Sequence, residues 1–139
     1  MCDDEIETRY CQYVEEVFNR HCVDAIAGYL AVDVVSHAHL TVGGRDGARD
    51  LVGSLVSAIP DFHLTIEALA VARNEVLARL TATGTHAGTF LGVAPTGRLV
   101  RVCAFGAWQL RDRECAEQWL QLDLTELFEQ LGAGPHFPR

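Results

Sequence analysis

This 139-residue sequence has no long hydrophobic run and little positive charge. No segment approaches the roughly 20 apolar residues that a membrane helix needs. Residues 1–10 are acidic and polar, whereas a signal peptide has a basic start and an apolar middle. Eleven Lys and Arg residues face nineteen Asp and Glu, for a net charge of −8. Because such a surface repels phosphate backbones, we expect no binding to nucleic acid. Without an apolar run or a signal peptide, we expect a cytoplasmic protein that does not bind membranes.

Several catalytic signatures are also missing. The five cysteines are an odd number and include no CxxC pair, which favours reduced thiols that pack as small hydrophobes. Cys11 and Cys22 have no clear base nearby in sequence, so a nucleophilic role lacks support. No Ser-His-Asp order or dinucleotide fingerprint occurs, and "GVAPTG" at 92–97 lacks the Lys-Ser/Thr of a phosphate-binding loop.

The first half of the sequence has helical periodicity. The length suits one domain, 1–139, with room for a core that contains a cavity. Apolar residues recur every three or four positions over 6–18 and again over 51–59, where Pro60 ends the pattern. A short helix is predicted at 24–30 and a strand or extended loop at 34–40.

The second half alternates with a period of two, as strands do. Two hairpins are predicted, the first turning at Asn74-Glu75 and the second at Asp112-Arg113. In the first hairpin, Ala68 is expected on the same face as Phe62, Leu64 and Ile66. The other predicted segments are the strands 62–72, 75–86, 99–111 and 114–123, a Gly-rich loop between the hairpins, a helix from 124 that Gly132 ends, and a loose tail, 133–139. Helices followed by antiparallel strands indicate an α+β fold, whose curved sheet would form a cone with an interior.

The stretch "QWLQLD" (118–123) ends an apolar strand in a carboxylate. Asp123 has two interpretations. It can cap the following helix, with Glu126 three residues on as in a capping box. Alternatively, it can lie in an apolar pocket that raises its pKa and act as a general acid and base.

Aromatic and amide side chains are candidates for binding a substrate. Trp119 and Trp108 are either core residues or a flat pocket wall. Phe90 is either a lid or the anchor of an exposed loop. Because neighbouring strand residues face opposite ways, Gln118 and Trp119 cannot both point inward without a bulge. Trp119, Gln121 and Asp123 alternate along the strand and so lie on one face of it, and we favour that set for the pocket.

Three histidines are further candidates. His37 and His39 form an H-x-H pair that could share one face of a strand, but no third metal ligand accompanies them at a persuasive spacing, so we expect no metal. We expect His37 to line the cavity and hydrogen-bond a substrate oxygen, with His39 near the rim. His86 is a second cavity candidate, and a structural role is the alternative for each.

Four stretches in the same order resemble one known family. They are "YCQYVEEVFNRHCVDAIAGYLAVDVVSH", "GRDGARDLVGSLVSAIPDFHLTIE", "TGTHAGTFLGVAPTGRLV" and "EQWLQLDLTELFEQLG". Together, over residues of about 5–132, they resemble the SnoaL-like polyketide cyclase family of the nuclear transport factor 2-like, or cystatin-like, superfamily. The resemblance implies a cone-shaped, curved antiparallel or mixed sheet wrapped around N-terminal helices.

The resemblance also implies an activity, an intramolecular aldol condensation that closes a ring of a polyketide without metal or cofactor. The implied acid/base is the acid at the end of the last strand, here Asp123. The family often has His where Gln118 stands, and a polar residue on the preceding strand where this chain has "FGAW". A homodimer or homotetramer through the outer face of the sheet is implied as well. The alternatives are another cone-fold enzyme (isomerase, epoxide hydrolase or polyketide-tailoring hydroxylase) and a non-catalytic ligand-binding or dimerisation module.

Overall fold

The computed structural model describes residues 1–132, so the predicted loose tail lies outside the described residues. No helix among residues 1–132 is long and apolar enough to cross a membrane. The first helix continues directly into a π-helical segment, η1, and a 3-10 segment, η2, follows it. In chain order the elements are α1 (Asp3–Tyr13), η1 (Val14–Asn19), η2 (Val23–Gly28), β1 (Leu30–His37), β2 (Thr41–Gly43), α2 (Arg45–Ala58), β3 (His63–Ala72), β4 (Glu75–Thr85), β5 (Leu99–Arg111), β6 (Glu114–Leu122) and α3 (Leu124–Leu131).

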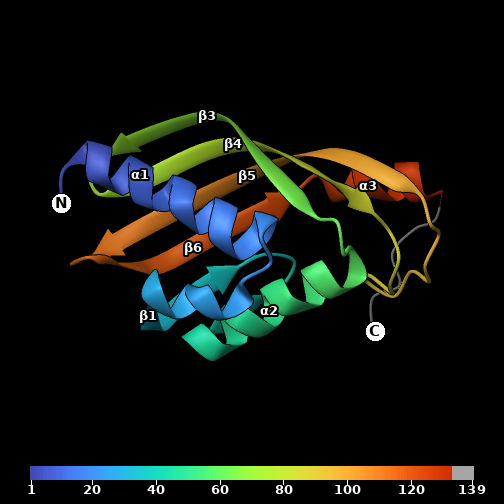
Figure 1. Cartoon of the computed structure of the whole chain (residues 1–139), viewed down its shortest axis with the longest axis horizontal. Helices are drawn as coiled ribbons and strands as arrows, with labels where there is room; N and C mark the ends of the chain where they lie inside the picture. Colours follow the sequence, from blue (N-terminus) through green and yellow to red (C-terminus); the bar gives the residue numbers. More distant parts are fainter. Residues whose placement is uncertain (133–139) are drawn as a thin grey trace.

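The strands form one mixed sheet in the order β2-β1-β6-β5-β4-β3. β1 and β6 pair in parallel, and every other neighbouring pair is antiparallel. The sheet is curved and unclosed, with α1 lying across the strands and α2 on the side of β1 (Figure 1). The predicted α+β cone with its N-terminal helices against the sheet is therefore confirmed.

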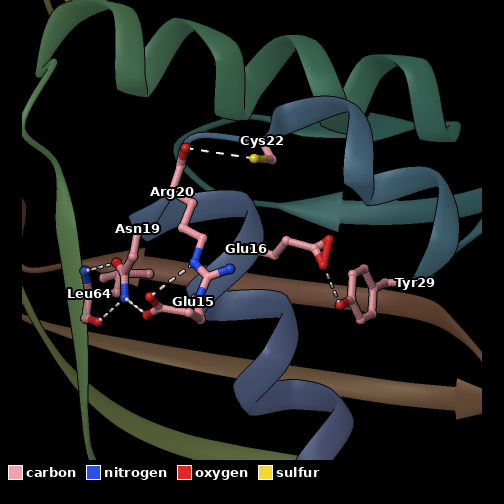
Figure 2. Close-up of polar contacts among 7 residues, drawn as sticks. All are labelled: Glu15, Glu16, Asn19, Arg20, Cys22, Tyr29 and Leu64. Carbon is pink, nitrogen blue, oxygen red and sulfur yellow. Dashed lines mark hydrogen bonds and ion pairs between the residues drawn. The ribbon is translucent and has the colours of Figure 1, made fainter.

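The first helix covers the predicted extent but widens in its last turns. Tyr10 and Tyr13 at the end of α1 and Val17 in η1 are all buried, as their helical spacing predicted. At the end of η1 the Asn19 side chain donates to the Leu64 carbonyl at 3.0 Å and accepts from the Leu64 N–H at 2.8 Å (Figure 2). This pair of bonds copies the pairing of a neighbouring strand and attaches η1 to β3.

Strand alternation holds in β4 but slips in β3. The inward residues of β4 are buried as predicted, and they are Val76, Ala78, Leu80 and Ala82. In β3 the pairing register shifts between Ile66 and Ala68, and Ala68 is exposed. The prediction that Ala68 shares a face with Ile66 is wrong, because a β-bulge adds one residue and inverts the side-chain pattern beyond it.

Both predicted hairpins form, and the first turn lies one residue from its predicted position. The first turn consists of Arg73 and Asn74, each with positive φ (53° and 60°), and so lies one residue before the predicted Asn74-Glu75. Two residues in the left-handed region match the twist of the flanking strands. The second turn, at Asp112-Arg113, is where it was predicted.

Candidate functional site

A cavity of about 180 Å³ lies between the helices and the sheet. A dry engineered cavity of about 150 Å³ holds one benzene molecule, so this space suits a ligand of one or two rings. Most of the lining is apolar. It comes from α1, η1, β1 with residues 38–39, α2, β3, the 89–91 loop, β5, β6 and the start of α3. The cavity thus lies in the interior that the curvature of the sheet predicted.

Aromatic rings form one wall of the cavity. Tyr10 meets Trp108 edge-on with ring centroids 5.2 Å apart, and Tyr13 lies 4.8 Å from the same indole. Trp108 is only 1% exposed, and its indole N–H has no hydrogen-bond partner among residues 1–132. Trp108 is therefore at once a core residue and a cavity residue, so both interpretations of this tryptophan hold.

Gly106 makes room for this wall. A Cβ at position 106 would lie 2.2 Å from the Tyr10 hydroxyl oxygen and 3.1 Å from a Leu80 methyl carbon. Glycine in the middle of a strand often marks such a close approach. Gly106 thus leaves space beside β5 for a tyrosine hydroxyl from α1. Burial raises the pKa of Tyr10, so this hydroxyl stays protonated.

Three polar side chains meet at the cavity. The Tyr13 hydroxyl donates to Gln118 Oε1 at 2.9 Å, and Gln118 Nε2 donates to Ser36 Oγ at 2.9 Å. Tyr13 and Ser36 are 2% and 4% exposed, and all three residues line the cavity. Burial raises the pKa of Tyr13 well above its ordinary value, so this phenol is a neutral donor.

His37 belongs to a second polar group. Its Nε2 lies 2.7 Å from Glu117 Oε2, and its Nδ1 lies 3.1 Å from Thr41 Oγ1. The imidazole stacks on Trp119, with centroids 5.2 Å apart and planes at 15°. His37 and Trp119 both contribute to the cavity lining, as predicted, while their side chains remain part-exposed.

The side chains of β6 that point toward the cavity are not the set that the sequence favoured. Gln118 makes its bonds toward helix α1 and buried Ser36, and so points inward. Trp119 and Gln121 also border a groove on the outer face together with exposed Leu77 and Phe105. The strand face of Trp119 and Gln121, which we favoured for the pocket, is thus mainly the outer face of the sheet. Both residues nevertheless also border the cavity.

Asp123 lies at the seam between β6 and α3. It is the N-cap of α3, and its Oδ1 accepts from the Glu126 N–H at 3.1 Å. The residue is exposed and is not part of the cavity lining. The capping interpretation is confirmed, and this position does not favour an acid/base role, because an exposed carboxylate lacks the apolar surroundings that such a role needs.

The remaining predicted residues lie around the cavity or behind its loop. Phe90 lines the cavity, and its ring meets that of His39 edge-on at 6.3 Å. His86 is 1% exposed and lies outside the lining, where its Nδ1 accepts from the Thr96 N–H at 3.2 Å. His86 therefore fixes the Gly-rich loop rather than touching the cavity.

The titratable groups of the lining are two tyrosines and two histidines, Tyr10, Tyr13, His37 and His39, and no carboxylate among residues 1–132 belongs to it. Sequence reasoning did not single out Tyr13, Ser36 or Glu117. The helical spacing of Tyr13 predicts a core residue, and no sequence pattern indicates that β1 pairs with β6. The parallel register that sets Ser36 beside Gln118, and His37 beside Trp119, is a property of the folded sheet.

The family model for the SnoaL-like polyketide cyclases matches residues 8–131. The chain belongs to this family. The matched range spans all the elements that form the cavity, from the later part of α1 to the end of α3. No curated protein matches the chain.

Solved structures share this fold at low sequence identity. A candidate SnoaL-like polyketide cyclase from Jannaschia sp. CCS1 has 22% identity and a TM-score of 0.87, with 96% of this chain and 95% of that one covered. AclR from Streptomyces galilaeus, described as a candidate hydroxylase, has 26% identity and a TM-score of 0.83, with coverage of 94% and 98%. IdmH from Streptomyces antibioticus, a candidate polyketide cyclase, has 24% identity, a TM-score of 0.78, and coverage of 92% and 99%.

Proposed function

We propose that this protein is a cofactor-free acid/base enzyme acting on an apolar, oxygenated small molecule. The reaction class is proton transfer at carbon, such as the intramolecular aldol condensation that closes a ring of a polyketide-like substrate. The observation that carries the proposal is the apolar cavity with a histidine–carboxylate pair, His37 and Glu117, at its border. Membership of the SnoaL-like polyketide cyclase family supports the substrate class.

His37 is the acid/base that this geometry favours. An ionised Glu117 accepts from Nε2–H, which leaves the lone pair of Nδ1 as the base. Thr41 now occupies that lone pair with its hydroxyl, at 3.1 Å, and a substrate C–H would take its place. The imidazole removes a proton from a carbon beside a carbonyl, the enolate carbon attacks the second carbonyl of the same molecule, and the imidazolium returns the proton to the new alkoxide.

The composition favours this enolate route over an imine route. All eleven basic Lys/Arg side chains are arginines, so the 139 residues offer no lysine for a Schiff base. The cavity's contribution is then to hold the enolate carbon near its electrophile, which supplies much of the acceleration in such unimolecular reactions.

Proton exchange at carbon tests the proposal without knowledge of the natural substrate. The bicyclic ketone 1-tetralone is of a size that suits the cavity, and its C2 protons exchange with deuterium when a base forms the enolate. We expect the native protein to accelerate this exchange, followed by NMR in D₂O, and His37→Gln to lose the acceleration while still binding the ketone. Exchange that survives in His37→Gln would exclude His37 as the base.

A non-catalytic binding module is the second candidate function. The absence of any carboxylate from the described lining favours it, because relatives in this family are implied to use an acid there. Binding of 1-tetralone without any acceleration of exchange by the native protein would support this module over an enzyme. The 26% identity to AclR makes a polyketide-tailoring hydroxylase the other enzymatic candidate, and oxygen consumption would reveal it.

We further propose that the protein is a homodimer or homotetramer that associates through the outer face of its sheet. Leu77 and Phe105 are 60% and 58% exposed there, beside a groove that runs along β3, β4 and β5. Large exposed apolar side chains gathered on one face are typical of interaction surfaces.

We also propose a cytoplasmic location for the protein. The five cysteines are all unpaired, which supports a reducing compartment.

A further inference from the structure

The hydrogen bonds between Tyr13, Gln118 and Ser36 leave two donors unused. The Tyr13 proton goes to Gln118 Oε1, and one amide proton of Gln118 goes to Ser36 Oγ. A primary amide carries two N–H protons and a hydroxyl carries one O–H proton. The second amide proton of Gln118 and the hydroxyl proton of Ser36 therefore have no acceptor among these partners, and both residues line the cavity.

We propose that Ser36 and Gln118 form a donor pair that binds one carbonyl oxygen of the ligand and stabilises it when it becomes an enolate oxygen. In this arrangement Tyr13 is a positioning residue, which holds the amide so that its NH₂ group faces Ser36. The inference rests on the proposed function for its substrate class, an oxygenated apolar molecule, but not on the identity of the base.

Burial makes this pair effective. Ser36 is 4% exposed, and the surrounding lining is mostly apolar, so water competes little for the two protons. Fixed donors aimed at an oxygen whose charge grows during the reaction contribute more in such a site than in water, and they need no reorganisation. A buried donor without an acceptor is costly, and a ligand oxygen removes that cost.

Tyr13 fixes the orientation of the amide from the opposite side. Its hydroxyl is held by the aromatic wall, since the ring packs against Trp108 and meets Phe18 edge-on with centroids 5.6 Å apart. Because the phenol stays neutral, it can donate to Gln118 Oε1 throughout the pH range of a stable protein. Without this donor, the amide could rotate and turn its oxygen toward the ligand's oxygen, which would repel it.

Two bicyclic probes of nearly the same shape test the donor pair, 1-tetralone with its carbonyl and tetralin without it. Binding is measured by calorimetry for the native protein and for Ser36→Ala, Gln118→Met and Tyr13→Phe. We expect each variant to bind 1-tetralone about fivefold more weakly, the effect of losing roughly one hydrogen bond, and to bind tetralin unchanged. Ser57→Ala, an exposed serine of α2 outside the lining, is the control and should change neither affinity.

The carbonyl stretch of bound 1-tetralone reports the contact directly. Donation from two protons lowers this frequency, so Ser36→Ala and Gln118→Met should each raise it toward the value in an apolar solvent. A loss of affinity for both probes alike would mean that the variants only alter the shape of the cavity, and it would overturn the proposal. A frequency unchanged by either variant would overturn it too.

The outcomes separate this inference from the proposed acid/base function. His37→Gln tests proton exchange and leaves the donor pair intact, so binding and carbonyl frequency should match those of the native protein. If exchange fails in every protein while the carbonyl shift responds to Ser36→Ala, the enzyme proposal falls and the donor pair stands. If exchange requires His37 but ignores Ser36 and Gln118, the donor pair falls and the enzyme proposal stands.

Discussion

At the scale of single residues, Asp123 shows how one side chain can satisfy two sequence patterns. An acid at the end of the last strand resembles the acid/base of the family, and an acid before a helix is also a common N-cap. Its bond to the Glu126 N–H at 3.1 Å and its exposure separate the two interpretations in favour of the cap. His37, which borders the cavity, is the acid/base that we propose in its place.

Two substitutions of Asp123 isolate the cap from any catalytic role. Asn caps helices about as well as Asp, whereas Ala removes the acceptor. We expect Asp123→Ala to lower the free energy of unfolding by about 1 kcal/mol and Asp123→Asn to leave it nearly unchanged. Chemical denaturation measures both.

The Asp123→Asn variant also tests whether Asp123 has a catalytic role. Because Asn has no ionisable proton, Asp123→Asn retains the cap but removes an acid/base. We expect it to keep the native rate of 1-tetralone exchange. A folded Asp123→Asn protein that has lost exchange would restore Asp123 to the acid/base role and remove His37 from it.

At the scale of secondary-structure elements, η1 attaches the N-terminal helix to the sheet. Its last residue, Asn19, bonds both backbone groups of Leu64 and also donates to Glu15 Oε2 at 3.0 Å (Figure 2). These bonds fix where α1 ends over the sheet and therefore where Tyr13 enters the cavity. π-Helical turns of this kind are frequent at functional sites.

Asn19→Ala should weaken the contact between η1 and β3 and destabilise the protein. The substitution leaves the Leu64 N–H and carbonyl without their side-chain partner, and we expect a loss of about 2 kcal/mol in the free energy of unfolding. Asn19→Asp is the matched comparison. It keeps the acceptor for the Leu64 N–H, but it sets a carboxylate oxygen against the Leu64 carbonyl and Glu15 Oε2, so its loss should be at least as large as that of Asn19→Ala. Equal stability of Asn19→Ala and the native protein, measured by urea unfolding, would contradict the role of this contact.

Elements also show where prediction from sequence ends. Periods of 3.6 and 2 predicted the helices, both hairpins and the buried face of β4, because apolar spacing directly records burial. The bulge after Ile66 was missed, because an extra strand residue has no characteristic side chain, and it inverted the expected face of Ala68. A second register shift, between Gln109 and Leu110 of β5, lies near the start of β6 and has no characteristic side chain either. The inward orientation of Gln118 is seen only in its bonds to Tyr13 and Ser36.

At the scale of the whole molecule, the cavity arises from contacts between distant segments. Tyr13 and Gln118 are 105 positions apart, and Ser36 and Gln118 are 82 apart. The candidates His37, Trp119 and Phe90 all contribute to the lining. The sequence predicted His37 for the cavity, favoured Trp119 because it shares a strand face with Gln121 and Asp123, and offered Phe90 as either a lid or the anchor of a loop. Tyr13, Ser36 and Glu117 could not be predicted, since only the parallel pairing of β1 with β6 and the angle of α1 bring them to the site.

The two faces of the sheet carry different surface features. The inner face carries the cavity, and the outer face exposes Leu77 and Phe105 beside Ala68, Ala70 and Ala107. Small alanines around two large apolar side chains leave room for matching side chains of a second copy. A two-fold interface pairs the same patch on both copies, so one substitution changes it twice.

Phe105→Arg should therefore dissociate the proposed dimer. An arginine at this position would set two like charges in an apolar interface, where each charge is costly to desolvate. Sedimentation velocity should show a dimer for the native protein and a monomer for Phe105→Arg across the micromolar range. Leu99→Arg is the control, because Leu99 is even more exposed, at 75%, but lies outside the groove. A native protein that sediments as a monomer, or a Phe105→Arg dimer as tight as the native one, would contradict association through this face, whereas dissociation by Phe105→Arg alone would place the interface opposite the cavity.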